Sequence, residues 1–142
     1  MSQENVEVVR RAYDRFNQTA ERRHGSNLDL SWFAELATPE FEYVAGLDFP
    51  GLPGGVHGID DFVRFLDGFW GIFEEARTDV VELIDAGDAV LAIVRFHGKG
   101  TQSGATVEMT AFQLWSFIEG KLASGRGFPT REEALEAAGL TE

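Results

Sequence analysis

The side chain most open to a chemical role in this sequence is Gln113, a single uncharged polar residue within an apolar pattern. It lies in the stretch TVEMTAFQLWSF, residues 106–117, which is typical of a long β-strand. Alternate residues of a strand point to opposite faces, so Gln113 shares one face with Ala111 and Trp115. A polar group on such a face needs a hydrogen-bond partner, which can be protein, water or a ligand.

The second candidate is Tyr13, whose side chain carries a hydroxyl. It lies on the apolar face of the first predicted helix, residues 3–18. Val6, Val9, Tyr13 and Phe16 recur there at spacings of three and four, which places them on one side. Tyr13 is either a core residue whose hydroxyl reaches the surface or a hydrogen-bonding group inside the protein. The helix pattern alone slightly favours the first interpretation.

Side chains that could move a proton are scattered. Asp48 falls in the Gly- and Pro-rich stretch GLDFPGLPGG, residues 46–55, which predicts a loop from which it could swing inward. Glu42 lies on a short predicted strand and points away from the face of Tyr43. His57 has no second metal ligand close in sequence, which favours a structural or exposed role. The sequence has no phosphate-binding glycine loop, no metal-ligand cluster and no spacing typical of a Ser-His-Asp triad.

The longest predicted helix, residues 58–75, has a face rich in aromatic side chains. Its apolar stripe is unusually aromatic and contains Phe62, Phe65, Leu66, Phe69 and Phe73, with Trp70 beside it. Packing against a sheet is the simplest role of such a stripe. Rigid rings that face a sheet can also leave a shaped space between them.

Further elements complete an α+β pattern. A second helix is expected over residues 28–36, with Trp32 on its apolar side, and a short strand over 41–44. Four strands separated by short turns predict an antiparallel meander, with bounds 79–85, 89–99, 106–117 and 121–128. Thr130 and Glu133 predict the start of a last short helix. Both faces of the stretch 106–117 are largely apolar, so we expect both to be covered.

Composition narrows the classes of function. The 142 residues suit a single domain, 1–142, and carry a formal net charge of −12, which disfavours nucleic acid and anionic membranes as partners. Cysteine is absent, and no apolar run is long enough for a membrane span. The N-terminus lacks an apolar signal-peptide core, so a cytoplasmic location is expected.

The order of these elements, together with five local motifs, resembles the nuclear transport factor 2-like superfamily. Within it the sequence is most similar to the SnoaL-like polyketide cyclase group. The resemblance spans nearly the whole chain and is carried by VVRRAYDRF, VHGIDDFVRFL, IDAGDAVLAIVRFHGKG, FQLWSFIEGKL and REEALEAAGL. It indicates a fold and no particular reaction, because this fold hosts many activities.

The resemblance implies a cone-shaped curved antiparallel sheet wrapped over the N-terminal helices, as in cystatin-like and nuclear transport factor 2-like folds. The pocket lies inside the cone, and the outer sheet face commonly forms a homodimer. Phe112 and Leu114 would then face a partner subunit, and no cofactor is expected.

Similarity to ketosteroid isomerases, which share this fold, implies roles for individual residues. Tyr13 matches the tyrosine that polarises a substrate carbonyl, and Gln113 stands where an assisting protonated aspartate lies. The position of the general base falls at Tyr43, or at Val44 with a one-residue slip, and neither is a carboxylate. That difference argues against the isomerase reaction. The glycines at 125 and 127 imply a roomier pocket if they face inward.

Three hypotheses follow. In the first, the protein binds a small, largely apolar molecule in a cavity lined by aromatic residues. In the second, it is a cofactor-independent cyclase, isomerase or dehydratase in which Tyr13 and Gln113 donate hydrogen bonds and Asp48, Glu42 or His57 is the base. In the third, side chains fill the cone and the protein is structural. The residues predicted to contact a ligand are Phe16, Trp32, Tyr43, His57, Phe62, Phe65, Phe69, Met109 and Trp115.

Overall fold

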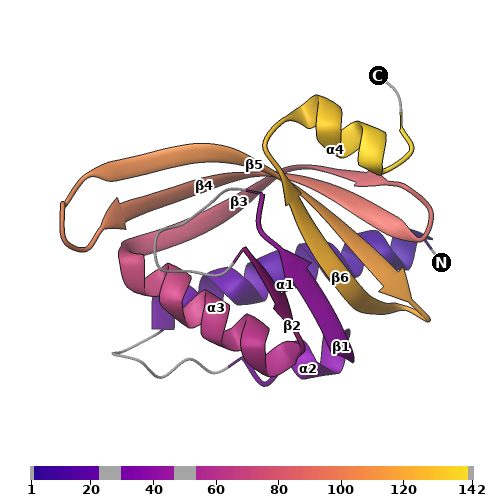
Figure 1. Cartoon of the computed structure of the whole chain (residues 1–142), viewed down its shortest axis with the longest axis horizontal. Coiled ribbons are helices and arrows are strands. Elements are labelled where there is room, and N and C mark those ends of the chain that lie inside the picture. Colours follow the sequence, from indigo (N-terminus) through magenta and orange to yellow (C-terminus); the bar gives the residue numbers. More distant parts are fainter. Residues whose placement is uncertain (1, 23–29, 47–53, 141–142) are drawn as a thin grey trace.

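The computed structural model describes residues 2–22, 30–46 and 54–140 and has an α+β architecture (Figure 1). Its helices are α1 (Ser2–Arg22), α2 (Phe33–Leu36), α3 (Ile59–Ile72) and α4 (Arg131–Ala137). Its strands are β1 (Ala37–Val44), β2 (Gly55–His57), β3 (Phe73–Asp85), β4 (Ala89–Gly100), β5 (Thr106–Ile118) and β6 (Lys121–Phe128).

The six strands form one curved, unclosed sheet in the order β2-β1-β6-β5-β4-β3. The run β3 to β6 is the predicted antiparallel meander. The sheet is mixed, because β1 pairs with β6 in parallel. The β1–β6 register shifts between Ala37 and Glu42, a stretch that contains Pro39, whose missing N–H cannot join the ladder. Further shifts in β3–β4 and β5–β6 bend the sheet around the helices.

Two predicted helices are shorter in the structure. The long helix ends at Ile72, and Phe73 begins β3. Phe73 continues the apolar stripe of the helix pattern and also fits the buried face of a strand, so periodicity could not separate the two structures. The second helix is the single turn α2, and the rest of the predicted range 28–36 precedes it or lies outside the described residues.

The core lies between the concave face of the sheet and the helices α1 and α3, which sit below strands β3 and β4 in Figure 1. It is built mainly from rings. Phe33, Phe41 and Phe62 are almost fully buried, and their ring centroids lie about 5.0 Å apart in each pair. Such ring pairs supply much apolar area and fix the spacing between helix and sheet.

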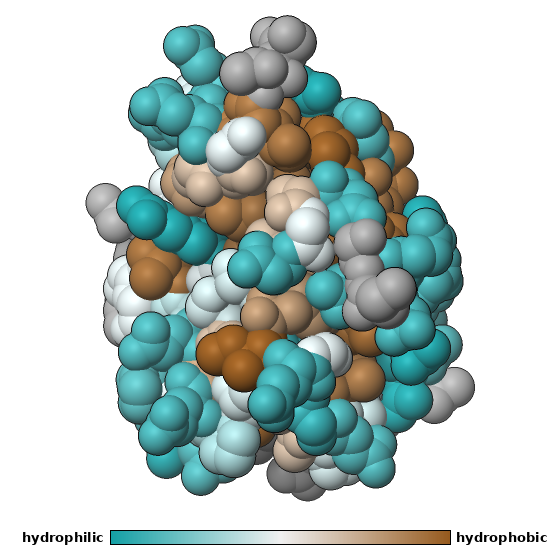
Figure 2. Space-filling model, turned by 90° about the vertical axis from the view of Figure 1, so that its right-hand side faces the viewer, coloured by the Kyte–Doolittle hydropathy of each residue, from teal (hydrophilic) through white to brown (hydrophobic). Residues whose placement is uncertain are grey.

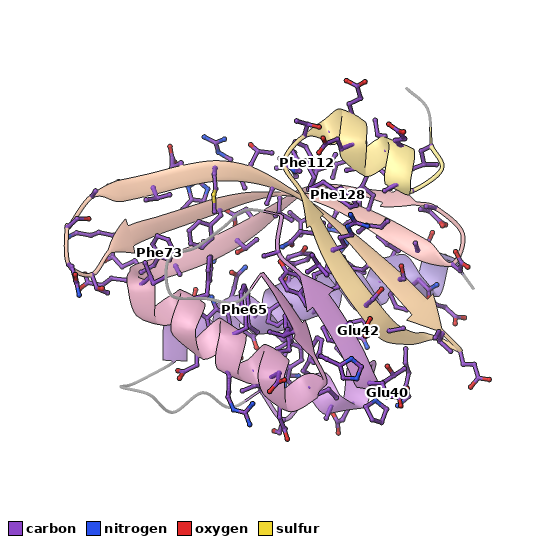
Figure 3. All side chains as sticks on the ribbon, viewed as in Figure 1. Glu40, Glu42, Phe65, Phe73, Phe112 and Phe128 are labelled. Atoms are coloured by element: carbon purple, nitrogen blue, oxygen red, sulfur yellow. The ribbon has the colours of Figure 1, made fainter. Side chains whose placement is uncertain are left out.

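The helix α4 covers part of the outer sheet face. Thr130 caps it, since its hydroxyl accepts a hydrogen bond from the Glu133 backbone N–H at 3.2 Å, as predicted. Its residues Ala134 and Leu135 form a second buried cluster with Leu91, against which Phe112 and Leu114 pack. Phe112 and its cross-strand partner Phe128 lie below α4 (Figure 3). The two residues predicted to face a partner subunit are therefore partly covered by their own chain.

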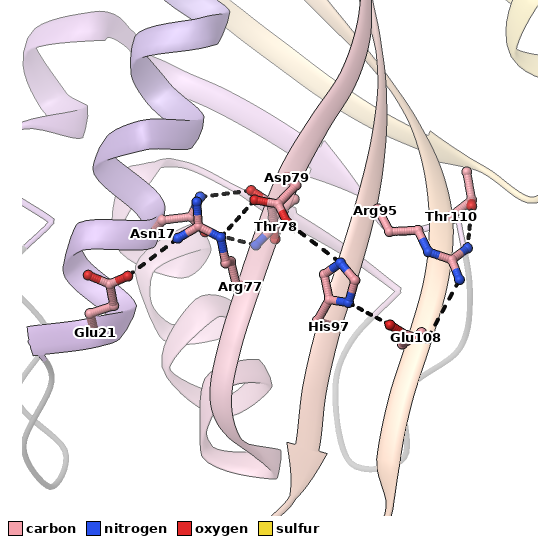
Figure 4. Close-up of polar contacts among 9 residues, drawn as sticks. All are labelled: Asn17, Glu21, Arg77, Thr78, Asp79, Arg95, His97, Glu108 and Thr110. Atoms are coloured by element: carbon pink, nitrogen blue, oxygen red, sulfur yellow. Dashed lines mark hydrogen bonds and ion pairs between the residues drawn. The ribbon is translucent and has the colours of Figure 1, made fainter.

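The remainder of the outer face on β3, β4 and β5 is charged. Cross-strand pairing places two rows of side chains there, Arg77, His97 and Glu108 in one and Asp79, Arg95 and Thr110 in the next. His97 is hydrogen-bonded to Glu108 at 2.9 Å, and Arg77 donates to Asp79 at 2.7 Å (Figure 4). Opposite charges thus alternate across this surface.

Large exposed hydrophobic residues are few in the described ranges. Val44, Val81 and Ile118 are the ones that stand out, with 45%, 64% and 60% of their surface exposed. On the face shown in Figure 2, hydrophobic residues are separated into patches by hydrophilic ones. None of the helices described is both long and apolar enough to cross a membrane.

Candidate functional site

A cavity of about 140 Å³ opens between α1, α3 and the concave sheet face. Most of its wall is aromatic or aliphatic. The described lining residues include no Asp, Glu, His, Lys or Arg. They are Tyr13, Phe16, Tyr43, Ala45, Gly46, Phe62, Phe65, Leu66, Phe69, Trp70, Thr78, Val94, Phe96, Met109, Thr110, Ala111, Phe112, Gln113, Trp115, Gly127, Phe128 and Pro129.

Four polar side chains of this wall form one hydrogen-bonded chain. The Trp115 Nε1–H donates to the Tyr13 hydroxyl oxygen at 2.9 Å. The Tyr13 hydroxyl donates to Gln113 Oε1, and Gln113 Nε2 donates to the Tyr43 hydroxyl at 2.9 Å. The sequence left open whether the partner of Gln113 is protein or ligand. The structure gives it two protein partners, one on α1 and one on β1.

The four hydrogen-bonded side chains are positioned by different elements. Gln113 and Trp115 lie on the concave face of β5, opposite Gly127 and Gly125 of β6. Tyr43 pairs with the same Gly125 from β1. A methyl group on Gly125 would come within 2.5 Å of Trp115 Cζ3 and 3.0 Å of Tyr43 Cδ1. The absence of a side chain at Gly125 therefore lets both rings pack closely against β6.

The expectation that glycines 125 and 127 enlarge the pocket is therefore wrong. The Trp115 ring occupies the space at Gly125. At Gly127 an added Cβ would lie 2.6 Å from the backbone nitrogen of Gly46. These glycines permit close approach of rings and backbone instead of leaving free volume.

Burial keeps both tyrosines neutral. It raises the pKa of Tyr43 to about 12, against a smaller lowering by the hydrogen bond from Gln113. Burial also raises the pKa of Tyr13 well above its ordinary value, and the Trp115 hydrogen bond only partly offsets this. At neutral pH both hydroxyls are thus protonated and can act as hydrogen-bond donors.

The side chain of Asn17, one turn after Tyr13, fixes α1 to the edge of the sheet. Its Nδ2 donates to the Thr78 carbonyl at 2.7 Å, and its Oδ1 accepts from the Thr78 N–H at 2.8 Å (Figure 4). The amide thereby pairs with edge strand β3 as another strand would. Because Tyr13 and Asn17 lie on the same helix face, this pairing also sets how Tyr13 enters the cavity.

Nine of the residues selected from the sequence line this cavity together. They are Tyr13, Phe16, Tyr43, Phe62, Phe65, Phe69, Met109, Gln113 and Trp115. Whether any of them contacts a ligand stays a prediction.

Trp32 and His57, which were also predicted to contact a ligand, do not line this cavity, and the exposed position of His57 agrees with the role that its sequence context favours. Trp32 is buried behind Phe16, with ring centroids 5.1 Å apart, and its Nε1 donates to the Thr19 hydroxyl at 3.2 Å. His57 is exposed at the end of β2 and hydrogen-bonded to Glu42 at 2.7 Å. Glu42 lies on β1 (Figure 3) and is exposed while Tyr43 is buried, which agrees with the predicted opposite orientations. Asp48 lies outside the described residues.

Some lining residues were not selected from the sequence. Phe96 and Val94 come from the apolar face of β4, and Trp70 lies beside the aromatic stripe of α3. The alternation of apolar residues along β4 and the helical spacing of those along α3 can be read in the sequence. Which part of each apolar face would remain uncovered depended on packing between distant elements.

This arrangement can hold an apolar molecule and offer it hydrogen bonds from neutral groups. It provides no ionised side chain from the described lining residues that could act as a general base. The described residues likewise contain no cluster of three or more His, Cys, Asp or Glu suited to a metal ion.

Comparison with known proteins agrees with the fold. The family model of the SnoaL-like domain matches residues 9–125. No protein with a curated description matches the sequence.

Solved structures provide three informative neighbours. A candidate SnoaL-like polyketide cyclase from Jannaschia sp. CCS1 is 22% identical, with a TM-score of 0.73, and the match covers 97% of this chain and 92% of that one. An NTF2-like protein of unknown function from Burkholderia pseudomallei is 20% identical, with a TM-score of 0.75 and coverages of 96% and 97%. TerC, co-crystallised with polyporic acid, is 19% identical, with a TM-score of 0.73 and coverages of 96% and 98%.

At these identities the structural matches establish the fold alone. The family match extends over more than half of the chain and includes Tyr13, Tyr43, Gln113 and Trp115. The chain therefore belongs to the SnoaL-like domain family.

Proposed function

We propose that this protein binds a small, largely apolar molecule in the cavity between α1, α3 and the sheet. The observation that carries the proposal is the cavity itself, whose wall is mainly aromatic and contains a small hydrogen-bonded polar group. This combination is typical of small-molecule sites, in which apolar walls supply affinity and a few polar groups orient the ligand.

The volume sets the size of the ligand. At about 140 Å³ the cavity is comparable to an engineered apolar cavity of about 150 Å³ that binds benzene. A molecule with one six-membered ring therefore fits without movement of side chains, and a larger ligand would extend through the open side. A purely structural role, with the cone filled by side chains, is less well supported because this volume remains.

Acetophenone, a ketone with one ring, is a suitable test compound. Isothermal titration calorimetry should detect saturable binding of acetophenone to the wild type. Ala111 lies in the cavity wall, so Ala111→Phe should fill the space and abolish binding. Ala137→Phe, an exposed change of the same kind on α4, is the matched control and should bind normally.

Two results would contradict the proposal. One is no saturable binding to the wild type. The other is equal binding to the wild type and to Ala111→Phe, provided that circular dichroism shows both to be folded, because the site would then lie elsewhere.

A second candidate function is a cofactor-independent cyclase, isomerase or dehydratase that acts on a polyketide- or steroid-like carbonyl compound. It is supported by the hydrogen-bonded pair of Tyr13 and Gln113 in the cavity and by the similarity to the candidate cyclase from Jannaschia sp. CCS1. Against it stands the lack of an ionised base among the described lining residues. A base would have to come from elsewhere, for example Asp48.

Isomerisation of 3-cyclohexenone to the conjugated 2-cyclohexenone, followed by ultraviolet absorbance, tests this second candidate. Tyr13→Phe and Gln113→Ala should each abolish turnover while the fold is retained. Turnover that persists in both variants would remove the two assigned roles.

A further inference from the structure

The hydrogen-bonded chain in the cavity has a direction, which decides which group can serve a ligand. An indole N–H can only donate, so Trp115 fixes the Tyr13 oxygen as an acceptor. The Tyr13 proton then goes to Gln113 Oε1. Tyr13 therefore already donates its only proton to a protein group.

Within the described residues, the other end of this hydrogen-bonded chain keeps a donor without an acceptor. The Tyr43 hydroxyl oxygen accepts from Gln113 Nε2, and its own proton has no acceptor among the described residues. The Gln113 amide also has two N–H donors, of which one is used. The two N–H bonds of an amide lie about 120° apart, so the unused one points away from Tyr43, and the Tyr43 hydroxyl is the donor that remains for a ligand at the cavity wall.

We infer that the Tyr43 hydroxyl donates to one acceptor oxygen of the ligand, and that Gln113, held in turn by Tyr13 and Trp115, is the positioning residue for that hydroxyl. This inference rests on the proposed function of the cavity and goes beyond it by naming the chemistry of the ligand. It also differs from the assignment of Tyr13 as the donor, which came from the resemblance.

The chemical class of the ligand follows from the donor in the cavity wall and from the lack of charged side chains among its described residues. A neutral hydroxyl donor matches a lone pair of a carbonyl oxygen. The described lining residues offer no Lys, Arg or His, so a carboxylate or phosphate would lose its hydration without a counter-charge. The structure therefore favours a neutral ketone, aldehyde or ester attached to a single ring.

The orientation of the Gln113 amide is the critical point. With the amide reversed, Tyr43 would donate to Gln113 Oε1, and Tyr13 would keep the proton that a ligand could receive. Either orientation satisfies the same number of protein hydrogen bonds. Removal of each hydroxyl in turn distinguishes the two.

The test compares two compounds of nearly the same shape. Acetophenone has a carbonyl oxygen where α-methylstyrene has a methylene group, so the ratio of their affinities measures the hydrogen bonds to that oxygen. In Tyr43→Phe this ratio should fall about fivefold, as expected for loss of one neutral hydrogen bond. In Tyr13→Phe the fall should be smaller, because the direct donor, the Tyr43 hydroxyl, remains. Thr19→Val is the control. It removes a hydroxyl that accepts a hydrogen bond from the buried Trp32 indole but does not line the cavity, so this variant should leave the ratio unchanged.

The outcomes separate the inference from the proposed function. If both compounds bind but only Tyr13→Phe lowers the ratio, Tyr13 is the donor and the inference is overturned while the binding function stands. Equal ratios in all variants would also overturn it, because no hydroxyl then contacts the oxygen. Failure of the wild type to bind either compound would overturn both.

A measurement on the wild type covers the case in which Tyr43→Phe does not fold. Infrared difference spectra of carbonyl-¹³C acetophenone should show the C=O stretching band of the bound ketone below its position in hexane, because donated hydrogen bonds weaken that bond. A band at the hexane position would show a carbonyl without donors and would overturn the inference.

Discussion

At the scale of single residues, Gln113 connects two tyrosines that lie thirty positions apart in the chain. Tyr13 donates to its oxygen, and its nitrogen donates to Tyr43. A glutamine can make these two bonds at once because its amide holds an acceptor and a donor side by side. A protonated aspartate, as in the ketosteroid isomerases that the sequence resembles, holds an acceptor and only one donor hydrogen, whereas the amide has two, which is a reason to expect different ligand contacts here.

The tyrosines provide a residue-scale prediction, because the chain contains only two and both are buried. Absorbance at 295 nm should show almost no tyrosinate in the folded protein at pH 10, since burial raises both pKa values, that of Tyr43 to about 12. The denatured protein should be about half ionised at that pH. A rise with a midpoint near pH 10 in the folded state would contradict the described burial.

The same shifts make stability depend on pH in a defined direction. A tyrosine whose folded pKa is raised contributes its full stabilisation below about pH 10, its unfolded pKa. The contribution is lost as pH rises from there through the folded pKa. Each tyrosine should lower the free energy of unfolding by about 1.4 kcal/mol per pH unit in that interval.

Most members of this cluster could be predicted from the sequence. Tyr13 and Gln113 were visible because each is a polar group on a periodic apolar face. The direction of the hydrogen bonds was not visible, since it depends on Trp115 Nε1 reaching Tyr13 from another element. Gly125 was misread as free space because a sequence does not reveal which neighbouring ring lies over a glycine.

At the scale of elements, the contact between α1 and β3 determines whether the cavity has its shape. Asn17 satisfies both backbone groups of Thr78 on an edge strand. Thr78 lines the cavity, and Tyr13 lies one turn away on the same helix. Asn17 thus links the stability of edge strand β3 to the positions of Tyr13 and Thr78 in the cavity wall.

Asn17→Ala is expected to lower the free energy of unfolding by about 1–3 kcal/mol, because the half-buried N–H and C=O of Thr78 would lose their partners. Chemical denaturation measures this change. Gln18→Ala, an exposed change at the next position, is the control and should stay within about 0.5 kcal/mol of the wild type. Equal stability of Asn17→Ala and Gln18→Ala would remove the structural role of Asn17.

The elements themselves were predicted in part. The meander, the first helix and the capped last helix were predicted because local periodicity and turn residues define them. The parallel pairing of β1 with β6 was missed because it joins segments about eighty residues apart, and no local signal encodes that contact. The α3–β3 boundary was misplaced because Phe73 satisfies both patterns.

At the scale of the whole molecule, the outer sheet face is divided between an apolar half under α4 and a charged half on β3, β4 and β5. The sequence could not reveal this division, because Phe112 and Leu114 are apolar whether a partner or α4 covers them. We propose that a homodimer forms through this outer face and that the charged half supplies its contacts. Since positive and negative side chains alternate there, two copies could pair them reciprocally.

Native mass spectrometry should then detect an assembly with twice the 15.7 kDa mass of the chain. Arg95→Glu should shift the equilibrium toward monomer, because it places a negative charge next to Glu108. Arg64→Glu on α3, away from that face, should not. A monomer at every concentration, or a dimer unaffected by Arg95→Glu, would contradict this part of the proposal.

If the cavity holds a neutral, single-ring carbonyl compound, a crystal structure with 4′-bromoacetophenone should show that compound inside it. The anomalous signal of bromine locates the ring without ambiguity. We expect bromine in or at the mouth of the cavity and the carbonyl oxygen within hydrogen-bond distance of Tyr43 Oη. A fully soaked crystal with an empty cavity, or with the compound bound elsewhere, would contradict it.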